Sequence, residues 1–154
     1  MSSGITFELN GERLTVGELP GQSLLDVLRN DRGLMATRMG CGQGQCGACR
    51  VLLDDVAVPA CDTPVWSVAG KRVTTLEGLG HRARPHPLQT AFIAQQALQC
   101  GFCTSGMIMT AAALLRRNAR PTADEVCSAL DDNLCRCGVH NRVVQAVLDA
   151  AAAV

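Results

Sequence analysis

Residues 40–49 read Gly-Cys-Gly-Gln-Gly-Gln-Cys-Gly-Ala-Cys, the most informative stretch in the first half of the chain. Its cysteines, Cys41, Cys46 and Cys49, have the spacing CxxxxCxxC, and Cys61 follows farther along the chain. This spacing is the plant-type ligand pattern of a 2Fe-2S cluster. The stretch therefore predicts a loop wrapped around an iron-sulfur cluster, with a fourth thiolate supplied from outside the loop.

The glycines between these cysteines support the same interpretation. A loop that encloses a cluster bends through backbone angles that side chains disfavour, and it directs N–H groups toward sulfur. Gly42, Gly44 and Gly47 stand at such places, and Gly42 and Gly44 are candidate cofactor-binding residues. Zinc is the alternative. Zinc sites usually draw paired ligands from two short knuckles, so three ligands in one glycine-rich loop favour iron and sulfide.

A second set of cysteines lies in the second half of the chain. Cys100 and Cys103 form a CxxC pair, and Cys135 and Cys137 form a CxC pair, each between two predicted helices. Two turns at one end of a helical bundle can deliver four thiolates to one metal centre, beside the positive ends of helix dipoles. On spacing alone, zinc stays open for this set. Cys127, the ninth cysteine, is expected to be buried on the apolar face of a helix.

Composition limits the classes of function. The chain has 154 residues, 14 Lys and Arg against 14 Asp and Glu, and 3% aromatic residues. A balance of zero without a basic run argues against nucleic-acid binding and an anionic membrane surface. No apolar stretch is long enough for direct membrane insertion. Residues 1–10 lack a secretory pattern, and the odd count of nine cysteines disfavours a disulfide scaffold, so a cytoplasmic protein is expected.

The pattern of apolar residues in the first half predicts a small mixed sheet with one helix. Asn10-Gly11 suits a type I′ hairpin turn, and Ser23 can cap a helix that ends near Gly33. The expected elements are a hairpin over 5–16, a helix from 24 to about 33, a hairpin over 50–58 turned at Asp54-Asp55, and a strand over 71–75.

Helical patterns dominate the second half. The polar, Pro-containing segment 77–86 predicts a linker in which His81 and His86 are solvated. Thr122 and Glu125 form a capping box for one of the helices. The helices are expected over 88–99, 106–117, from 122 onward, and over 142–153. The predicted division is a first domain over 1–76, the linker over 77–86, and a helical domain over 87–154.

The runs 40–49, 99–107 (QCGFCTSGM) and 133–138 (NLCRCG) closely resemble the iron-sulfur subunit of molybdenum hydroxylases, the xanthine dehydrogenase and aldehyde oxidoreductase family. The run 74–79 (TTLEGL) looks like the domain junction of that family. The resemblance covers almost the whole chain. It implies an α+β fold, in which an N-terminal β-grasp ferredoxin-like domain and a C-terminal four-helix bundle each hold one 2Fe-2S cluster.

The resemblance also implies an electron-transfer role. Cys100, Cys103, Cys135 and Cys137 would hold the cluster nearest a molybdopterin cofactor, expected in its cytosine dinucleotide form, on a separate large subunit. Gln99 and Cys137 match positions that touch the pterin in relatives. Electrons would leave through the cluster of Cys41, Cys46, Cys49 and Cys61, and the substrate, an N-heteroaromatic compound or an aldehyde, would be hydroxylated on the partner.

Two departures from the common pattern refine the resemblance. Ser105 stands where many relatives have Pro, and a serine can cap the helix start equally well. Cys137 is followed directly by Gly138, without the usual intervening Thr. The shortened form resembles the isoquinoline 1-oxidoreductase and nicotinate dehydrogenase small subunits. Large subunits of that branch can carry cytochrome c domains, so a cytochrome or a flavin subunit is the expected acceptor.

Two other function classes compete with a dedicated subunit. A free-standing two-cluster ferredoxin would be an electron carrier that is stable alone, whereas a subunit should expose an apolar patch to a large partner. A zinc-dependent interaction module would be colourless. For a subunit, a periplasmic or membrane-associated location is expected only if a partner carries the chain there.

Overall fold

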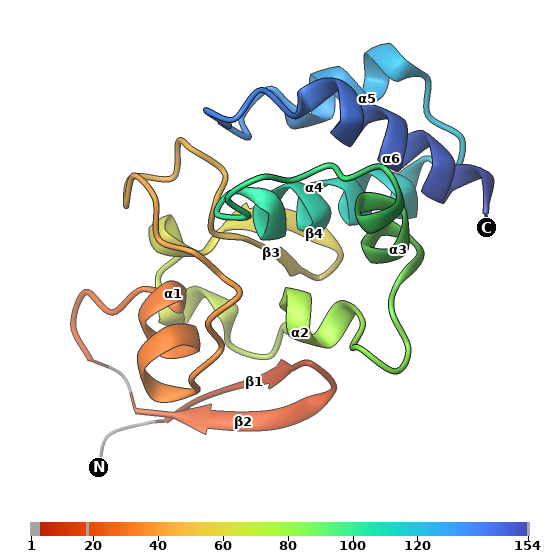
Figure 1. Cartoon of the computed structure of the whole chain (residues 1–154). Coiled ribbons are helices and arrows are strands. Elements are labelled where there is room, and N and C mark those ends of the chain that lie inside the picture. The colour runs from red at the N-terminus through yellow and green to blue at the C-terminus, as the bar shows by residue number, and fades with distance from the viewer. Residues whose placement is uncertain (1–3, 18, 154) are drawn as a thin grey trace.

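The computed structural model describes residues 4–17 and 19–153, and in them a five-stranded mixed sheet packs against helices (Figure 1). The strand order is β2-β1-β5-β3-β4; β1 and β5 are parallel, and the other neighbours are antiparallel. The expected α+β class is confirmed. The strands are β1 (Ile5–Leu9), β2 (Glu12–Val16), β3 (Arg50–Leu53), β4 (Val56–Pro59) and β5 (Arg72–Thr74).

Both hairpins turn where the sequence predicts. Asn10 and Gly11 have φ values of 52° and 88°, as a type I′ turn requires. Asp54 and Asp55 have φ values of 47° and 71°, which aspartate tolerates better than most residues. Asp54 accepts a hydrogen bond from the Arg72 N–H at 2.9 Å, and Asp55 accepts one from the Arg72 guanidinium at 2.7 Å. These bonds tie the turn to the neighbouring strand β5.

The first helical segment covers one face of the sheet. The Ser23 hydroxyl accepts from the Asp26 N–H at 3.1 Å, and the Asp26 carboxylate accepts from the Ser23 N–H at 3.2 Å. Helix α1 (Leu24–Asp26) continues as the π-helical turn η1 (Val27–Asp31), and Gly33 follows with a φ of 66°. The sequence predicts the cap and the end of this segment but not its wider turn. Its apolar side chains share a core with β1 and β3.

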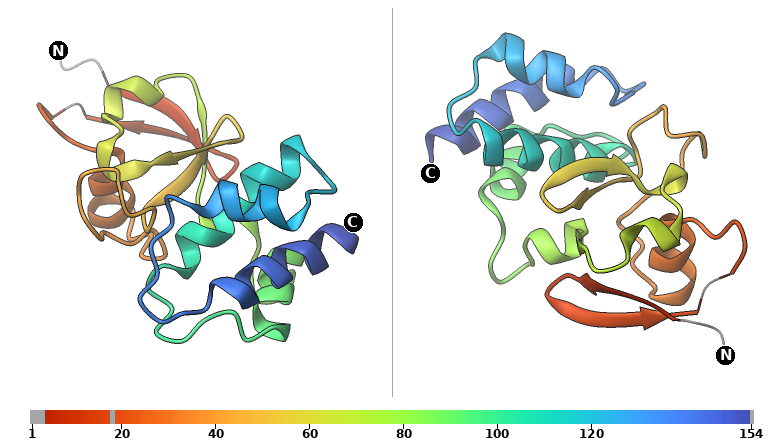
Figure 2. Two further views of the ribbon diagram at one scale, coloured as in Figure 1. Left: turned by 90° about the horizontal axis from the view of Figure 1, so that it is seen from above. Right: turned by 180° about the vertical axis from the view of Figure 1, so that it is seen from behind.

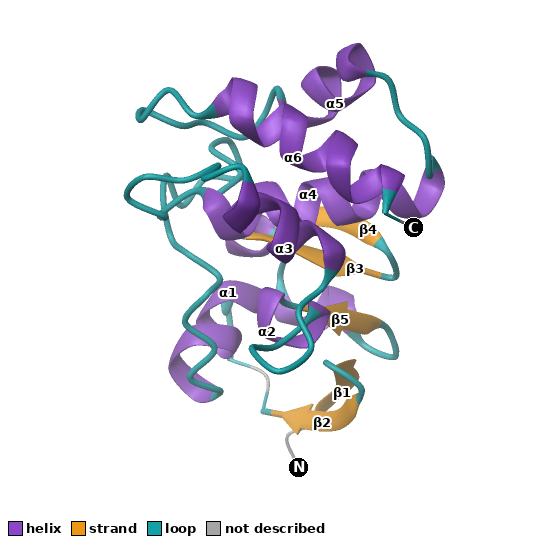
Figure 3. Cartoon of the chain, turned by 45° about the vertical axis from the view of Figure 1, so that its right-hand side comes forward, coloured by secondary structure: helices purple, strands orange, loops and turns teal. Residues whose placement is uncertain are grey.

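The longer helices pack on the opposite face of the sheet (Figures 2 and 3). Successive side chains of a strand point to opposite faces of the sheet. Val51 is therefore buried in the core that β3 shares with α1, and Leu52 in the core that β3 shares with the longer helices. Helix α4 packs against β3, and the other three helices pack around it. None of the helices within residues 4–17 and 19–153 is long and apolar enough to cross a membrane. The helices are α3 (Pro87–Ala94), α4 (Thr104–Arg117), α5 (Ala123–Leu130) and α6 (His140–Ala152).

The segment that joins the two halves is ordered at its start. Helix α2 (Leu76–Leu79) overlaps the predicted linker 77–86. The Glu77 carboxylate accepts hydrogen bonds from the Thr75 hydroxyl at 2.7 Å and from the Ala36 N–H at 2.9 Å. The junction is therefore attached to the sheet half, and the division into domains stays a prediction.

Two expectations for the helices are wrong. Helix α3 ends at Ala94 and not at Gln99, because the chain turns at Gln96, whose φ is 49°. Cys127 is exposed and not buried. On α5 the buried stripe consists of Val126 and Leu130, which lie four residues apart on one face; Cys127 is turned away from that face.

His86 has a structural role that its place in a polar segment did not indicate. It is half-buried and forms the N-cap of α3: its Nδ1 accepts a hydrogen bond from the Leu88 N–H at 3.2 Å. The Gln89 side chain accepts from the His86 N–H at 2.9 Å and completes a capping box. Burial lowers the pKa of His86 below its ordinary value of 6.5. His81 is exposed, as expected.

This cap makes stability depend on pH. Protonated His86 cannot accept the Leu88 hydrogen bond, and its charge would face the positive end of the helix dipole. A lowered pKa in the folded state means that the contribution is complete above pH 6.5 and is lost as the pH falls through the folded-state pKa. We expect a loss of about 1 kcal/mol in the free energy of unfolding. Urea unfolding at several pH values should show the loss in the wild type and not in His86→Asn, which keeps an acceptor but does not titrate.

Candidate metal centres

The first set of cysteines meets beside the start of β3. The hairpin register pairs Arg50 with Pro59, and the Ala60 N–H donates to the Cys49 carbonyl at 3.2 Å. This pairing places Cys49, just before β3, next to Cys61 in the 3-10 turn η2 (Ala60–Asp62). The glycine-rich loop brings the other two cysteines of the set to the same place.

Backbone N–H groups of the loop point at sulfur. The Sγ of Cys41 accepts from the N–H groups of Gln43 at 3.4 Å, Gln45 at 3.3 Å and Cys46 at 3.4 Å. These bonds lower the pKa of the Cys41 thiol to about 7, because they stabilise its thiolate. The Sγ of Cys46 accepts in turn from the Cys41 N–H at 3.3 Å. The loop is thus already arranged to hold thiolate sulfur.

The glycines named as cofactor-binding candidates lie in this loop with left-handed backbone. Gly42 and Gly44 have φ values of 69° and 72°. The Gly44 N–H donates to the Sγ of Cys61 at 3.2 Å, so this glycine links the loop to the distant fourth cysteine. Any larger residue at position 44 would strain the backbone and crowd the side chain of Asp62.

Cys49 is the most buried member of the first set. It is 2% exposed, and burial raises the pKa of its thiol to about 12, with the nearby Cys61 thiol adding to the effect. A buried thiol of this kind releases its proton when a metal ion supplies the compensating charge. Exposure in the set falls from Cys41, which is exposed, through the half-buried Cys46 and Cys61 to the buried Cys49. The contacts pair Cys41 with Cys46 and Cys49 with Cys61.

The second set of cysteines meets where two helix-to-helix loops come together. Cys100 and Cys103 lie before α4, and Cys135 and Cys137 lie before α6. The Sγ atoms of Cys100 and Cys137 are 3.6 Å apart. Burial raises the pKa of Cys103 to about 12, and its thiol interacts with that of Cys135. The four predicted cysteines are thus brought together as two pairs, Cys100 with Cys137 and Cys103 with Cys135. Each of the two loops contributes one cysteine to each pair.

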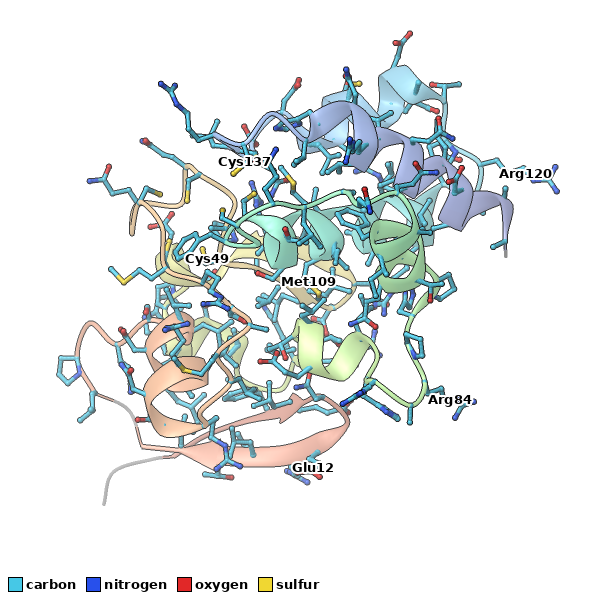
Figure 4. All side chains as sticks on the ribbon, in the orientation of Figure 1. Glu12, Cys49, Arg84, Met109, Arg120 and Cys137 are labelled. Carbon is cyan, nitrogen blue, oxygen red and sulfur yellow. The ribbon has the colours of Figure 1, made fainter. Side chains whose placement is uncertain are left out.

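This pairing suits a centre with two metal ions. Within the described residues, no group of three or more His, Cys, Asp or Glu side chains is placed to hold a single metal ion. In both sets, however, four thiols are arranged two by two, which is the donor arrangement for two irons that each take two thiolates. The residues present therefore fit a 2Fe-2S cluster at each place. Figure 4 labels one cysteine of each set, Cys49 and Cys137, and both lie in the left half of the view, where the loops gather.

The two sets are joined by direct contacts. The Leu134 N–H donates to the Cys46 carbonyl at 3.0 Å, and Asn133 Nδ2 donates to the Gly47 carbonyl at 3.1 Å. Arg38 precedes the glycine-rich loop of residues 40–49, which we call the first loop. Its guanidinium lies 5.9 Å from the centre of the ring of Phe102, a residue between Cys100 and Cys103. Asn133 belongs to one of the sequence motifs, yet the motif alone assigns it no role, because a lone asparagine gives no signal of what it will face.

Gln99 is the remaining candidate residue. Its Nε2 donates to the Cys137 carbonyl at 3.0 Å, so the side chain lies beside the second set, and it is exposed. Arg136, between two of the cysteines, is exposed as well. Together with Phe102 and Leu134, which are 46% and 63% exposed, these residues form an accessible edge of the second set.

Ser105 does not cap the helix, contrary to the expectation. Cys103 is the N-cap of α4, and Ser105 lies inside the first turn. Its hydroxyl is buried and finds no hydrogen-bond partner among the described residues. We therefore expect Ser105→Ala to raise the free energy of unfolding by about 1 kcal/mol, since it removes an unpaired buried hydroxyl. Urea denaturation measures this change, and a destabilised variant would contradict the unpaired state of the hydroxyl.

Comparisons with known proteins agree with this geometry. Residues 7–74 match the family described as "2Fe-2S iron-sulfur cluster binding domain", and residues 75–148 match the "[2Fe-2S] binding domain" family. The boundary between the two matches falls at the end of β5. The first match covers the sheet half with its glycine-rich loop, and the second covers the helices with the CxxC and CxC pairs.

Individual relatives span nearly the whole chain. A nicotinate dehydrogenase subunit from Pseudomonas putida is 48% identical over 98% of this chain and 96% of its own length. The alpha subunit of isoquinoline 1-oxidoreductase from Brevundimonas diminuta is 47% identical over 96% of this chain and 97% of its own. The crystal structure of the aldehyde oxidoreductase from Desulfovibrio desulfuricans has a TM-score of 0.94 and 44% identity; the match covers 98% of this chain and 17% of that one.

Proposed function

The chain belongs to the family of iron-sulfur subunits of molybdenum hydroxylases, and on this basis we propose that it relays single electrons from a molybdopterin cofactor on a large partner subunit to an acceptor. The branch resemblance is confirmed as well, because the relatives include nicotinate dehydrogenase and isoquinoline 1-oxidoreductase subunits. In this proposal the chain makes no bond to substrate, and its function is electron transfer.

The observation that supports this function best is the arrangement of eight thiols in two sets joined by a backbone hydrogen bond. The bond from the Leu134 N–H to the Cys46 carbonyl connects a neighbour of Cys135 to a member of the first set. Two one-electron centres linked so directly suit a relay better than two independent structural metals. In a zinc-binding module a short connection between the two sites could not serve electron transfer, since zinc does not change its oxidation state.

The proposed metal ligands divide between two 2Fe-2S clusters. When bound, the clusters supply one-electron centres whose potentials depend on hydrogen bonds to sulfur and on burial. The chain provides both kinds of control, through the amides around Cys41 and the buried position of Cys49. The first cluster is held by Cys41, Cys46, Cys49 and Cys61, and the second by Cys100, Cys103, Cys135 and Cys137.

We assign the accessible edge of the second set to the partner. Gln99 and Cys137 would contact the pterin of the molybdopterin cofactor, for which we propose the cytosine dinucleotide form. The exposed side chains of Phe102 and Leu134 supply apolar area for the large subunit beside them. Arg136, between two thiolates, offsets negative charge at the same edge.

Substrate and acceptor follow from the relatives. The names nicotinate dehydrogenase and isoquinoline 1-oxidoreductase favour an N-heteroaromatic substrate, with an aldehyde as the second choice. Beyond the first cluster, the acceptor that we propose is a cytochrome c domain or a flavin subunit. The compartment is that of the assembled complex, which is cytoplasmic unless a partner subunit carries the chain elsewhere.

The fold assignment that accompanies this proposal is a β-grasp domain over 1–76, a linker over 77–86 and a four-helix bundle over 87–154. The order of the strands and the packing of α3 to α6 around one core support it.

Purification of the tagged chain from cells grown on an N-heteroaromatic substrate tests the function. A large molybdenum-containing chain should co-purify, and visible absorbance of the clusters should bleach when substrate is added without acceptor. Recovery of the chain alone, with two clusters, would favour a free-standing electron carrier and overturn the proposed subunit role.

A further inference from the structure

The carbonyl group of Gly47 is enclosed by both halves of the second cysteine set. A methyl group on Gly106, three residues after Cys103, would overlap the Gly47 carbonyl oxygen, so the first turn of α4 lies directly against it. Asn133, two residues before Cys135, donates its Nδ2 to the same oxygen at 3.1 Å. One peptide of the first loop is thus held from the Cys103 side and from the Cys135 side.

Asn133 is built into this contact. Its side chain is part of a residue only 2% exposed, and it reaches the Gly47 carbonyl across 86 positions of the sequence. A Cβ on Gly47, whose φ is 74°, would come within 2.5 Å of Asn133 Nδ2. The second donor to this carbonyl, the Arg50 N–H, is longer at 3.4 Å. The asparagine amide therefore fixes the loop that lies between Cys46 and Cys49.

We propose that Asn133 is a positioning residue that sets the rate of electron transfer between the two clusters. The inference rests on the proposed relay function and names a residue outside the ligand sets. The step it serves is the movement of one electron from the cluster of the second set to that of the first; the donor cluster is oxidised, the acceptor cluster is reduced, and no bond is made or broken.

The physical reason is the sensitivity of electron tunnelling to distance. Tunnelling falls steeply as the separation of donor and acceptor grows, and the first loop has no secondary structure of its own over residues 40–49. Without the Asn133 amide, the Gly47 carbonyl keeps only its longer bond to the Arg50 N–H. The loop is then held to the Cys135 segment by the Leu134–Cys46 backbone bond but no longer at Gly47, so its distance from that segment is less tightly fixed. Asn133 acts through this loop and not by touching a cluster.

The test compares Asn133→Leu with the wild type in the assembled enzyme. Leucine has a similar volume but cannot donate a hydrogen bond. After one electron is introduced by pulse radiolysis, the absorbance change that reports equilibration between the clusters should be slower by at least about tenfold. Iron content per chain should be unchanged. Asn133→Ser, whose hydroxyl is too short to reach the carbonyl, should show the same slowing.

Val143→Ala is the matched control for a merely structural effect. Val143 is fully buried on α6, so its truncation destabilises the helical core without changing the contact to Gly47. We expect it to lower the melting temperature and to leave the rate of electron transfer within about twofold of the wild-type rate.

Each result separates the inference from the proposed function. If the wild type transfers electrons between two clusters and both Asn133 variants do so at the wild-type rate, Asn133 does not position the loop. If neither Asn133 variant takes up two clusters while Val143→Ala does, the residue serves folding alone, and the inference is overturned. A wild-type chain without two redox-active clusters would instead refute the relay itself.

Discussion

Replacing Cys137 by alanine should lower the iron content from about four to about two atoms per chain and slow turnover of the assembled enzyme by more than about a hundredfold. Cys137 lies 3.6 Å from Cys100, so its loss removes half of the thiol pair on the exposed side of the second set. The first set shares no thiol with it. Electron paramagnetic resonance of the reduced protein should therefore lose one signal and keep that of the Cys41 set.

The ninth cysteine provides the control. Cys127 is exposed on α5, outside both sets, so Cys127→Ala should keep about four iron atoms per chain and full turnover. Loss of the Cys41-set signal in Cys137→Ala would show that the ligands are wrongly assigned.

Gly106→Ala should reduce the free energy of unfolding by about 3 kcal/mol. At an exposed helix position the same change would stabilise the protein by about 1 kcal/mol, because alanine favours helix. Here the added methyl overlaps the Gly47 carbonyl oxygen, and neither backbone can yield without moving the first loop or α4. Urea unfolding measures the loss, and iron uptake by both sets should fall with it.

Ser105→Ala, one position earlier, serves as the comparison. It introduces the same side chain into the same helical turn but removes an unpaired hydroxyl, so the two alanine variants should change stability in opposite directions. A Gly106→Ala protein as stable as the wild type would mean that α4 and the first loop are not in close contact.

Local chemistry made much of the fold predictable. Asn10-Gly11 needs a left-handed turn, and Ser23 and Thr122 offer oxygen acceptors to free helix N–H groups; all three occur in the structure as expected. The cysteine spacings were equally informative, since loops of fixed length can bring sulfur atoms together only in a few ways.

Contacts between distant parts of the chain were not predictable in the same way. In the sequence, Gly106 is only a residue of low helix propensity within a helical pattern. Its close contact with the Gly47 carbonyl is visible only in the structure. Asn133 has a structural role only through a partner far away in the sequence. Cys127 lies three residues before Leu130, a helical spacing, yet the buried stripe of α5 runs through Val126 and Leu130 and leaves Cys127 exposed. Periodicity describes one element at a time, whereas these residues depend on how two elements meet.

The contents of iron and acid-labile sulfide in the anaerobically purified chain show whether it holds two clusters. Two 2Fe-2S clusters require about four iron and about four sulfide per polypeptide, with two distinguishable signals on reduction. Zinc in either set, or iron for one cluster only, would contradict the assignment of this chain as a two-centre electron relay.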